Sequence, residues 1–227
     1  MNDKTPSMLV IIAALNEEAG IGPSLAELRM VLGDSKYLVV DGDSTDRTVK
    51  VAKEFGAEIL FQEGIGKGEA IAQAIKHVNS DVKYVVFTDA DYTYPAKCVP
   101  EMIRILEANP EVGMVTGNRF NHHLDLKAMK SPFYMGNRFL AWAQLFLNRI
   151  NLNDPLTGLR AVKWSILKNW EPKSKGFDIE AEMNHQVENM GYKTVEIPIK
   201  YRCRLGTKKL KLTHGFSILK RIISESL

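Results

Sequence analysis

The chain has 227 residues, 45% of them hydrophobic and 25% charged, and this composition is typical of one globular domain with a sizeable core. Its formal net charge of +3 is too small to indicate nucleic acid as a partner. The most apolar stretch, residues 139–147, lies between Arg138 and Arg149 and is far shorter than the roughly 20 residues of a membrane-spanning helix. Cys98 and Cys203 have no Cys-x-x-Cys spacing and are expected to be reduced thiols.

The first half of the chain alternates short apolar runs with stretches of helical spacing. The runs, which are expected to be buried strands, cover residues 7–15, 36–41, 57–61, 83–89 and 112–117. The helical stretches cover residues 22–33, 45–56, 68–78 and 97–108, with Ser44 as the expected N-cap of the second. This alternation predicts an α/β fold with a mostly parallel central sheet and helices on both faces.

The alternation of expected strands and helices ends after Arg119. Residues 121–132 are polar and loop-like, helices are expected over 133–150 and 177–191, and a strand is expected over 193–204. The tail should form an amphipathic helix from about Gly215. We therefore expect a single domain, residues 1–227, made of a first half (1–119) and a second half (120–227).

Two acids follow the fourth expected strand, in the sequence "FTDADYTYP". Side chains alternate along a strand, so Asp89 and Asp91 should point to the same side and repel each other unless a cation lies nearby. Oxygen ligands of this kind suit Mg²⁺ or Mn²⁺, which commonly arrive with a phosphate-bearing substrate. The pair thus indicates a metal–diphosphate site, the alternative being a solvated acidic turn or a cap for the next helix.

An ordered series of motifs runs from Leu9 to about Lys211: "ALNEE", "VVDGDSTDRT", "GIGKGE", "FTDADYTYP", "GNRF", "DPLTGLRA", "GFDIEAEM" and "EIPIKYRCRLGTKKLK". Together they resemble family 2 glycosyltransferases, which have the GT-A fold, a Rossmann-like nucleotide-diphospho-sugar transferase fold. The series is most similar to that of polyprenyl-phosphate (dolichyl-phosphate) hexose synthases, which transfer mannose or glucose. A nucleotidyltransferase is disfavoured because no arginine-containing, glycine-rich loop follows the first strand.

The resemblance assigns a role to each matching position. It implies catalytic roles for Asp89, Asp91, Arg119 and Arg138, and metal ligation by Asp89 and Asp91. It places the acceptor beside Arg119, Arg138 and Asp154. The residues that it places at the nucleotide-sugar donor are Ala13, Leu15, Glu17, Asp41, Lys67, Asp89, Ala90, Asp91, Thr93, Arg119, Arg204 and Lys209. Asp46, next to this set, is expected to cap a helix instead.

The acceptor decides which catalytic groups are needed. A phosphate monoester, with a second pKa of about 6, is largely dianionic at neutral pH and needs cations more than a base. A hydroxyl acceptor would need a base, for which Asp154 is the candidate. The resemblance therefore implies inverting transfer from a GDP-mannose- or UDP-glucose-type donor to a polyprenyl or dolichyl phosphate, with Mg²⁺ or Mn²⁺. The alternatives are a glycan transferase with a hydroxyl acceptor and an inactive subunit of a membrane complex.

A lipid-linked acceptor must be reached at a membrane surface. The helices expected over 133–150 and near the C-terminus carry apolar and basic residues that could lie on a lipid surface, or pack against the core or a partner. The first residues also lack the features of a signal peptide. We expect peripheral attachment at the cytoplasmic face of the membrane, and the sequence leaves open a membrane-anchoring partner or a homo-oligomer.

Overall fold

The computed structural model describes residues 7–78, 82–120 and 131–227, and within them the strands form one seven-stranded sheet. The strands are β1 (Met8–Ala14), β2 (Lys36–Asp41), β3 (Glu58–Phe61), β4 (Tyr84–Asp89), β5 (Val112–Asn118), β6 (Arg160–Lys163) and β7 (Lys193–Pro198). The helices are α1 (Glu18–Leu32), α2 (Thr48–Glu54), α3 (Lys67–His77), η1 (Ala96–Cys98), α4 (Val99–Ala108), α6 (Pro132–Asn148), α7 (Trp164–Leu167), α8 (Ile179–Asn189) and α9 (His214–Ser224).

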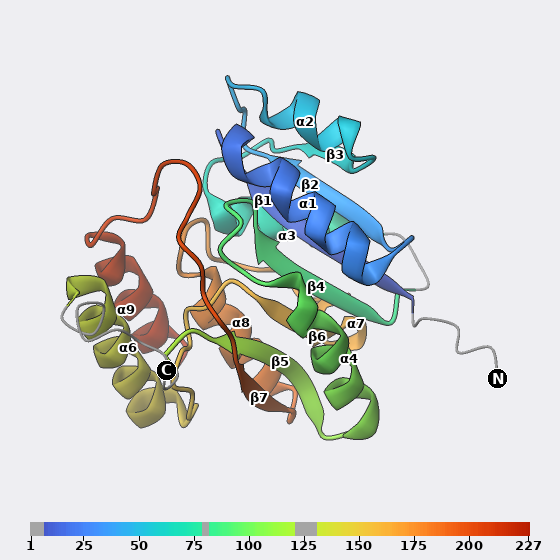
Figure 1. The fold of residues 1–227 in the computed structure, drawn as a ribbon. Helices are drawn as coiled ribbons and strands as arrows, with labels where there is room; N and C mark the ends of the chain where they lie inside the picture. The colour runs from blue at the N-terminus through green and yellow to red at the C-terminus, as the bar shows by residue number, and fades with distance from the viewer. Residues whose placement is uncertain (1–6, 79–81, 121–130) are drawn as a thin grey trace.

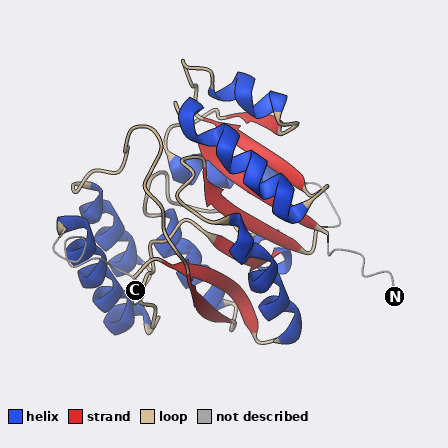
Figure 2. Ribbon diagram, viewed as in Figure 1, coloured by secondary structure: helices blue, strands red, loops and turns tan. Residues whose placement is uncertain are grey.

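The sheet has the order β3-β2-β1-β4-β6-β5-β7 and lies between two layers of helices (Figures 1 and 2). Alternate residues of β1 face opposite layers, as the geometry of a strand requires. Val10 and Ile12 pack in one core with α1, α2 and α4, while Leu9 and Ile11 pack in the other with α3, α7 and α8. The predicted α/β fold with a mostly parallel sheet is confirmed.

A third group of packed side chains joins α6 and α9 to α8. Leu140 of α6, Ala181 of α8, and Ile218 and Ile222 of α9 are buried together, and α6 and α9 lie side by side beyond the sheet (Figure 1). The outer side of α9 leaves Phe216 exposed. The expected amphipathic helix at the end of the chain is therefore present.

One strand was not predicted. β6 runs antiparallel to both β4 and β5 and separates them, whereas the other neighbouring strands pair in parallel. Its four residues begin with Arg160 and show no apolar run long enough to stand out in the sequence. The strand expected over 193–204 is also shorter, since β7 ends at Pro198.

The start of the second helix differs from the expectation as well. Ser44 is not its N-cap: α2 begins at Thr48, and the Ser44 hydroxyl accepts a hydrogen bond from the Asn16 amide at 2.9 Å. Asp46 is not the N-cap residue either, because Arg47 occupies that position, but the Asp46 carboxylate accepts from the Thr48 amide at the start of α2 at 2.9 Å. Most of the loop expected over 121–132 lies outside the described residues.

None of the helices in the described ranges combines the length and the apolar character that crossing a bilayer demands.

Gly68, in the first turn of α3, provides a test of how closely α3 packs on the segment before α8. Its amide donates to the Lys175 carbonyl at 2.9 Å, and a Cβ atom added to it would lie 2.1 Å from the Ser174 carbonyl oxygen. We expect Gly68→Ala to lower the free energy of unfolding by about 1–3 kcal/mol, because backbone must move to admit the methyl group. Urea denaturation measures this change.

The matched control is Gly136→Ala in α6, where an added Cβ would meet no atom within 4 Å. In an open helical position alanine should raise the free energy of unfolding by about 0.5–1 kcal/mol relative to glycine. Equal effects of the two substitutions would contradict the close contact at Gly68.

Candidate active site

The candidate site lies where the carboxyl ends of β1, β2 and β4 meet at one edge of the sheet. Ala14 is paired in register with Asp41, and Ala13 is paired with Asp89. Leu15, directly after β1, is 41% exposed at this edge. In open parallel sheets ligands bind beyond the carboxyl ends of the strands, so these predicted residues are gathered where a ligand would lie.

Asp91 is held by groups on both of its oxygens. Oδ1 accepts from the Thr93 hydroxyl at 2.6 Å and from the Thr93 amide at 3.1 Å, while Oδ2 lies 2.9 Å from Nη1 of Arg204. Burial raises the pKa of Asp91, and the nearby carboxylate of Asp89 raises it further. The two aspartates therefore do repel each other, and Arg204 is the cation that compensates Asp91.

Glu17 joins the same cluster from the loop after β1. Its Oε1 accepts hydrogen bonds from Nη2 of Arg204 and, at 2.5 Å, from the ammonium of Lys209, which also donates to the Asn16 carbonyl at 2.9 Å. Burial raises the pKa of Glu17, against the opposing effects of Lys209 and Arg204. The segment after β7 thus folds across the strand ends and places two cations among the site's carboxylates.

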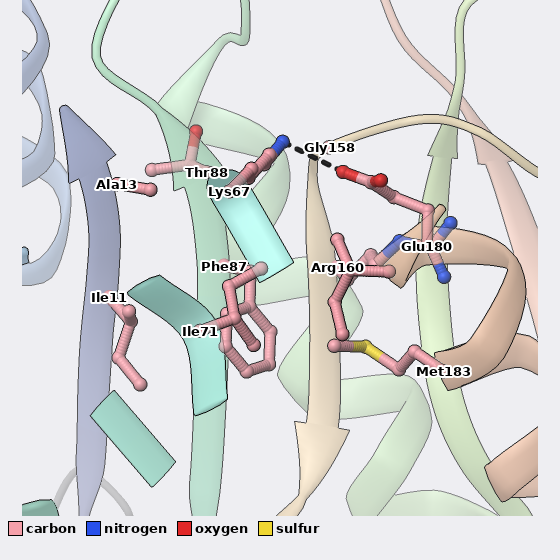
Figure 3. Close-up of a pocket in the computed structure, with 11 residues that line it drawn as sticks. Ile11, Ala13, Lys67, Ile71, Phe87, Thr88, Gly158, Arg160, Glu180 and Met183 are labelled. Carbon is pink, nitrogen blue, oxygen red and sulfur yellow. Dashed lines mark ion pairs between the residues drawn. The ribbon is translucent and has the colours of Figure 1, made fainter. Parts of the chain in front are cut away.

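Asp89 is paired with Lys67, a residue that the resemblance assigns to the donor. The Lys67 ammonium lies 2.7 Å from Oδ1 of Asp89 and 2.7 Å from Oε1 of Glu180 in α8; Figure 3 shows the second ion pair. Burial alone would raise the pKa of Asp89, but Lys67, together with Arg119 and Arg204, outweighs this effect and the pKa is lowered. Burial would likewise lower the pKa of Lys67, but the two carboxylates raise it.

The first turn of α3 packs on protein instead of opening its amides to the site. The amides of Gly68 and Glu69 both donate to the Lys175 carbonyl, at 2.9 and 3.3 Å. Because these two amides already have a hydrogen-bond acceptor, they are not open to a phosphate in this structure.

A cavity of about 10 Å³, room for roughly one water molecule, lies beneath the Lys67–Glu180 pair (Figure 3). Arg160 lines it, although its side chain is only 1% exposed. The Arg160 guanidinium donates to the carbonyls of Pro155 and Thr157, at 2.6 and 2.8 Å, and to Oδ1 of Asn184 at 2.5 Å. Arg160 thereby fixes the loop that begins at Asp154.

Arg119 and Asp154 form a buried bidentate ion pair. Nε and Nη2 of Arg119 each lie 2.7 Å from an oxygen of Asp154, and the Arg119 amide donates to the same carboxylate at 2.9 Å. Asn137 of α6 adds a further donor at 3.2 Å. Burial alone would lower the pKa of Arg119, but Asp154 raises it well above its usual value. Asp154 is fully buried, so it is placed as the partner of Arg119.

A group of cations surrounds the outer side of this pair. Lys208 lies with its ammonium 3.0 Å from the centre of the Phe133 ring, and burial lowers its pKa. The positive charges of Arg119 and Arg204 lower this pKa further, so the three cations act on one another electrostatically. Arg138 is exposed on α6 and donates to the Asn153 carbonyl at 3.1 Å, so it lies at the margin of the group.

Asp41 has an oxygen available for a ligand. The residue is only 1% exposed, and its Oδ2 accepts from the Ser44 amide at 2.9 Å, whereas Oδ1 is buried without a partner among the described residues. A buried acceptor left unpaired is costly, so a donor group is expected here when the site is filled. Ala90, the residue between the paired aspartates, is buried beneath the site.

The donor set fits a dication that arrives with a ligand. Among the residues that the structure describes, no three His, Cys, Asp or Glu side chains converge as a complete metal site. Asp89 and Asp91 can supply two carboxylates only, so phosphate oxygens and water would have to complete the coordination, which is how Mg²⁺ is usually bound. The two residues predicted as metal ligands are therefore suitable, but they are not sufficient alone.

Sequence reasoning missed the partners that hold the site residues in place. Glu180, Asn137 and Glu196 were not predicted in this role, although Glu196 accepts from the Asp154 amide at 2.8 Å. The one available signal was that Glu180 belongs to "GFDIEAEM", a motif of the ordered series. Its pairing with Lys67 depends on the packing of α8 beside α3, which no local pattern encodes.

Comparison with known proteins identifies the family of this chain. Residues 9–162 match the family described as Glycosyl transferase family 2. The chain is 32% identical to a dolichyl-phosphate hexose transferase of Haloferax volcanii, with 97% of this chain and 94% of that protein covered. It is 26% identical to the dolichol-phosphate mannosyltransferase of Pyrococcus furiosus, with 94% of this chain and 62% of that longer protein covered.

Among solved structures, the fold is similar to that of glucosyl-3-phosphoglycerate synthase from Mycobacterium tuberculosis, crystallised with Mn²⁺, uridine diphosphate and phosphoglyceric acid. The TM-score is 0.78 at 21% sequence identity, and the match covers 97% of this chain and 78% of that one. The family match spans well over half of the chain and includes β1 to β5 with the paired aspartates. The protein is therefore a glycosyltransferase that belongs to glycosyl transferase family 2 and has the GT-A fold.

Proposed function

We propose that the protein transfers a hexose, with inversion, from a nucleotide-sugar of the GDP-mannose or UDP-glucose type to a polyprenyl or dolichyl phosphate. The names of two relatives support a lipid phosphate as acceptor. The observation that carries the proposal is the cation group beside the paired aspartates, in which Arg204 lies 2.9 Å from Asp91 and Arg119 is oriented by its bidentate pair with the buried Asp154. Clustered cations of this kind are stabilised by a bound phosphate.

The donor would lie across the strand ends. The unpaired oxygen of Asp41 would accept a hydrogen bond from the base, while Ala13, Leu15 and Glu17 border the nucleoside. Asp89 and Asp91 would hold Mg²⁺ or Mn²⁺, which when bound neutralises charge on the departing nucleoside diphosphate. Thr93 fixes the orientation of Asp91, and Lys67 fixes that of Asp89.

Transfer would require little proton chemistry from the protein. A phosphate oxygen of the acceptor attacks the anomeric carbon from the side opposite the leaving group. The bond between that carbon and the diphosphate oxygen breaks, and the nucleoside diphosphate leaves with the electron pair. Arg119, oriented by Asp154, would guide the acceptor phosphate, with Lys208 and the peripheral Arg138 adding positive charge.

The geometry disfavours the alternative of a hydroxyl acceptor. That reaction needs a base within reach of the hydroxyl proton. Asp154, the candidate base, is fully buried and both of its oxygens accept from Arg119. Losing that pair would leave a buried guanidinium without a counter-charge, which is costly.

We further propose that α6 lies on the cytoplasmic surface of a membrane. Phe139, Trp142 and Phe146 form an exposed aromatic stripe in which neighbouring rings lie 6.2 and 4.6 Å apart, and Arg138 and Arg149 lie at its two ends. Aromatic side chains beside basic ones suit the lipid headgroup region. The same helix contributes Asn137 to the Arg119–Asp154 pair, so a lipid phosphate entering along α6 would reach the cation group.

The central test incubates the purified protein with labelled GDP-mannose or UDP-glucose, Mn²⁺ and a short polyprenyl phosphate. Label should move into the lipid with one donor, and Asp91→Asn should reduce the rate at least about a hundredfold by weakening charge stabilisation of the leaving group. Asp34→Asn, which alters an exposed aspartate after α1, is the matched control and should leave the rate unchanged. Absence of lipid labelling with either donor would overturn the proposed acceptor.

The pH dependence distinguishes the two kinds of acceptor. For a phosphate acceptor, kcat/KM should rise as the pH passes the acceptor's second pKa of about 6, because the dianion is the nucleophile. Asp154→Asn should lower kcat/KM through the misplaced Arg119 yet keep the same acid limb, since the titrating group belongs to the substrate. Loss of that limb in Asp154→Asn, or turnover of a soluble hydroxyl acceptor, would instead identify Asp154 as a base.

Membrane contact predicts a specific loss of vesicle binding. The double substitution Phe139→Ser and Trp142→Ser should weaken binding to vesicles of phosphatidylcholine and phosphatidylglycerol at least about tenfold, because apolar area is removed from the contact. Co-sedimentation of the protein with the vesicles measures this binding. Met30→Ser, which alters an even more exposed apolar residue on α1, is the control and should have no effect. Equal losses in both variants would contradict docking through α6.

A further inference from the structure

Arg204 occupies the position between two of the site's carboxylates. Its Nη1 lies 2.9 Å from Oδ2 of Asp91, and its Nη2 donates to Oε1 of Glu17. Glu17 follows β1, Asp91 follows β4, and Arg204 follows β7, so the guanidinium joins three separate segments. An internal cation thus already neutralises the carboxylate proposed to bind the metal.

The backbone fixes the segment that carries Arg204, while the side chain keeps unused bonding capacity. The Leu205 amide donates to the Asp91 carbonyl at 3.0 Å, and the Arg202 amide donates to the Thr93 carbonyl at 3.0 Å. Nε of Arg204 and Oε2 of Glu17 are buried without partners in the part of the chain that the structure describes. The guanidinium is therefore under-satisfied in its present place and has a donor to spare for another anion.

From this geometry we infer that Arg204 is the counter-cation of Asp91 until a ligand binds. Arg204 releases the Asp91 carboxylate only when a phosphate group replaces that carboxylate as the partner of the guanidinium. The inference rests on the proposed function, in which Asp91 binds a dication. A dication alone would have to displace Arg204 from Asp91 and leave the partly buried guanidinium with Glu17 as its remaining carboxylate partner, which Lys209 already shares. A dication that arrives with a nucleoside diphosphate brings phosphate oxygens, and Arg204 can exchange its carboxylate partner for one of them.

This exchange makes metal binding and nucleotide binding interdependent. Each must strengthen the other by the same factor, because coupling between two equilibria is reciprocal. The consequence is that the protein would bind a free dication weakly. Removal of the guanidinium should therefore strengthen binding of the metal alone and weaken its coupling to the nucleotide.

The experiment measures Mn²⁺ binding by the loss of the free-ion electron paramagnetic resonance signal, with and without UDP or GDP. In the wild-type protein, one of the two nucleotides should tighten Mn²⁺ binding at least about tenfold, ~1.4 kcal/mol. Arg204→Gln should bind Mn²⁺ alone about tenfold more tightly than wild type, and the added effect of the nucleotide should shrink. Arg204→Lys, which keeps the charge, should bind Mn²⁺ alone within a fewfold of wild type.

The matched control is Arg202→Gln. Arg202 lies two residues away in the same segment, but its guanidinium pairs with Glu27 of α1, at 2.5 and 2.7 Å, and not with the site. The substitution Arg202→Gln should therefore leave Mn²⁺ binding unchanged. Unchanged Mn²⁺ affinity in Arg204→Gln, with normal nucleotide coupling in wild type, would overturn the inference and leave the proposed function standing. Absence of Mn²⁺ binding to wild type with either nucleotide would instead overturn the metal site itself.

A measurement on the wild-type chain covers the case in which Arg204→Gln does not fold. The arginine side-chain NH signals are recorded by nuclear magnetic resonance, with the Arg204 signal assigned through Arg204→Lys. This signal should shift on addition of Mg²⁺ together with UDP or GDP, and it should stay in place on addition of Mg²⁺ alone. A signal that moves with Mg²⁺ alone, or remains unchanged in the full complex, would overturn the inference.

Discussion

The repulsion between two carboxylates at the end of β4 organises the site. Asp89 and Asp91 lie close enough that each influences the charge of the other, and a separate cation compensates each one. Lys67 comes from α3 and Arg204 from the segment after β7. Because partly buried like charges need counter-charges from somewhere, this one constraint ties the start, the middle and the end of the chain to a single edge of the sheet.

The general fold could be predicted because buried parallel strands leave a strong signal. Each strand from β1 to β5 coincides with a short apolar run. Both faces of β1, β2, β4 and β5 are covered, whereas β3, at the end of the sheet, is only partly buried and leaves Phe61 exposed. β6 left no such signal: it is four residues long, and its first residue is a buried arginine. That arginine is stable inside the protein because backbone carbonyls and Asn184 accept its hydrogen bonds, which is a property of the folded loop and not of the local sequence.

For the site, the sequence indicated the residues and their shared edge, but not how they pair. The resemblance placed Lys67 at the donor, yet the neighbouring glycines allow α3 to pack against the Ser174 and Lys175 backbone, and the ammonium lies between Asp89 and Glu180. The prediction of Asp154 near the acceptor likewise could not show that both carboxylate oxygens belong to Arg119. Such pairs join elements that meet only after folding.

The two sides of α6 face different environments, the Arg119–Asp154 pair on the inner side and the proposed membrane surface on the outer side. The inner side of α6 packs on α8 and α9 through Leu140 and places Asn137 on the Asp154 carboxylate, while its outer side presents aromatic rings. If the rings lie at lipid headgroup depth, the rigid helix sets the height of Arg119 above the membrane. A phosphate anchored in that membrane would then meet a guanidinium already oriented by a buried carboxylate, so little ordering would remain to be done when the acceptor binds.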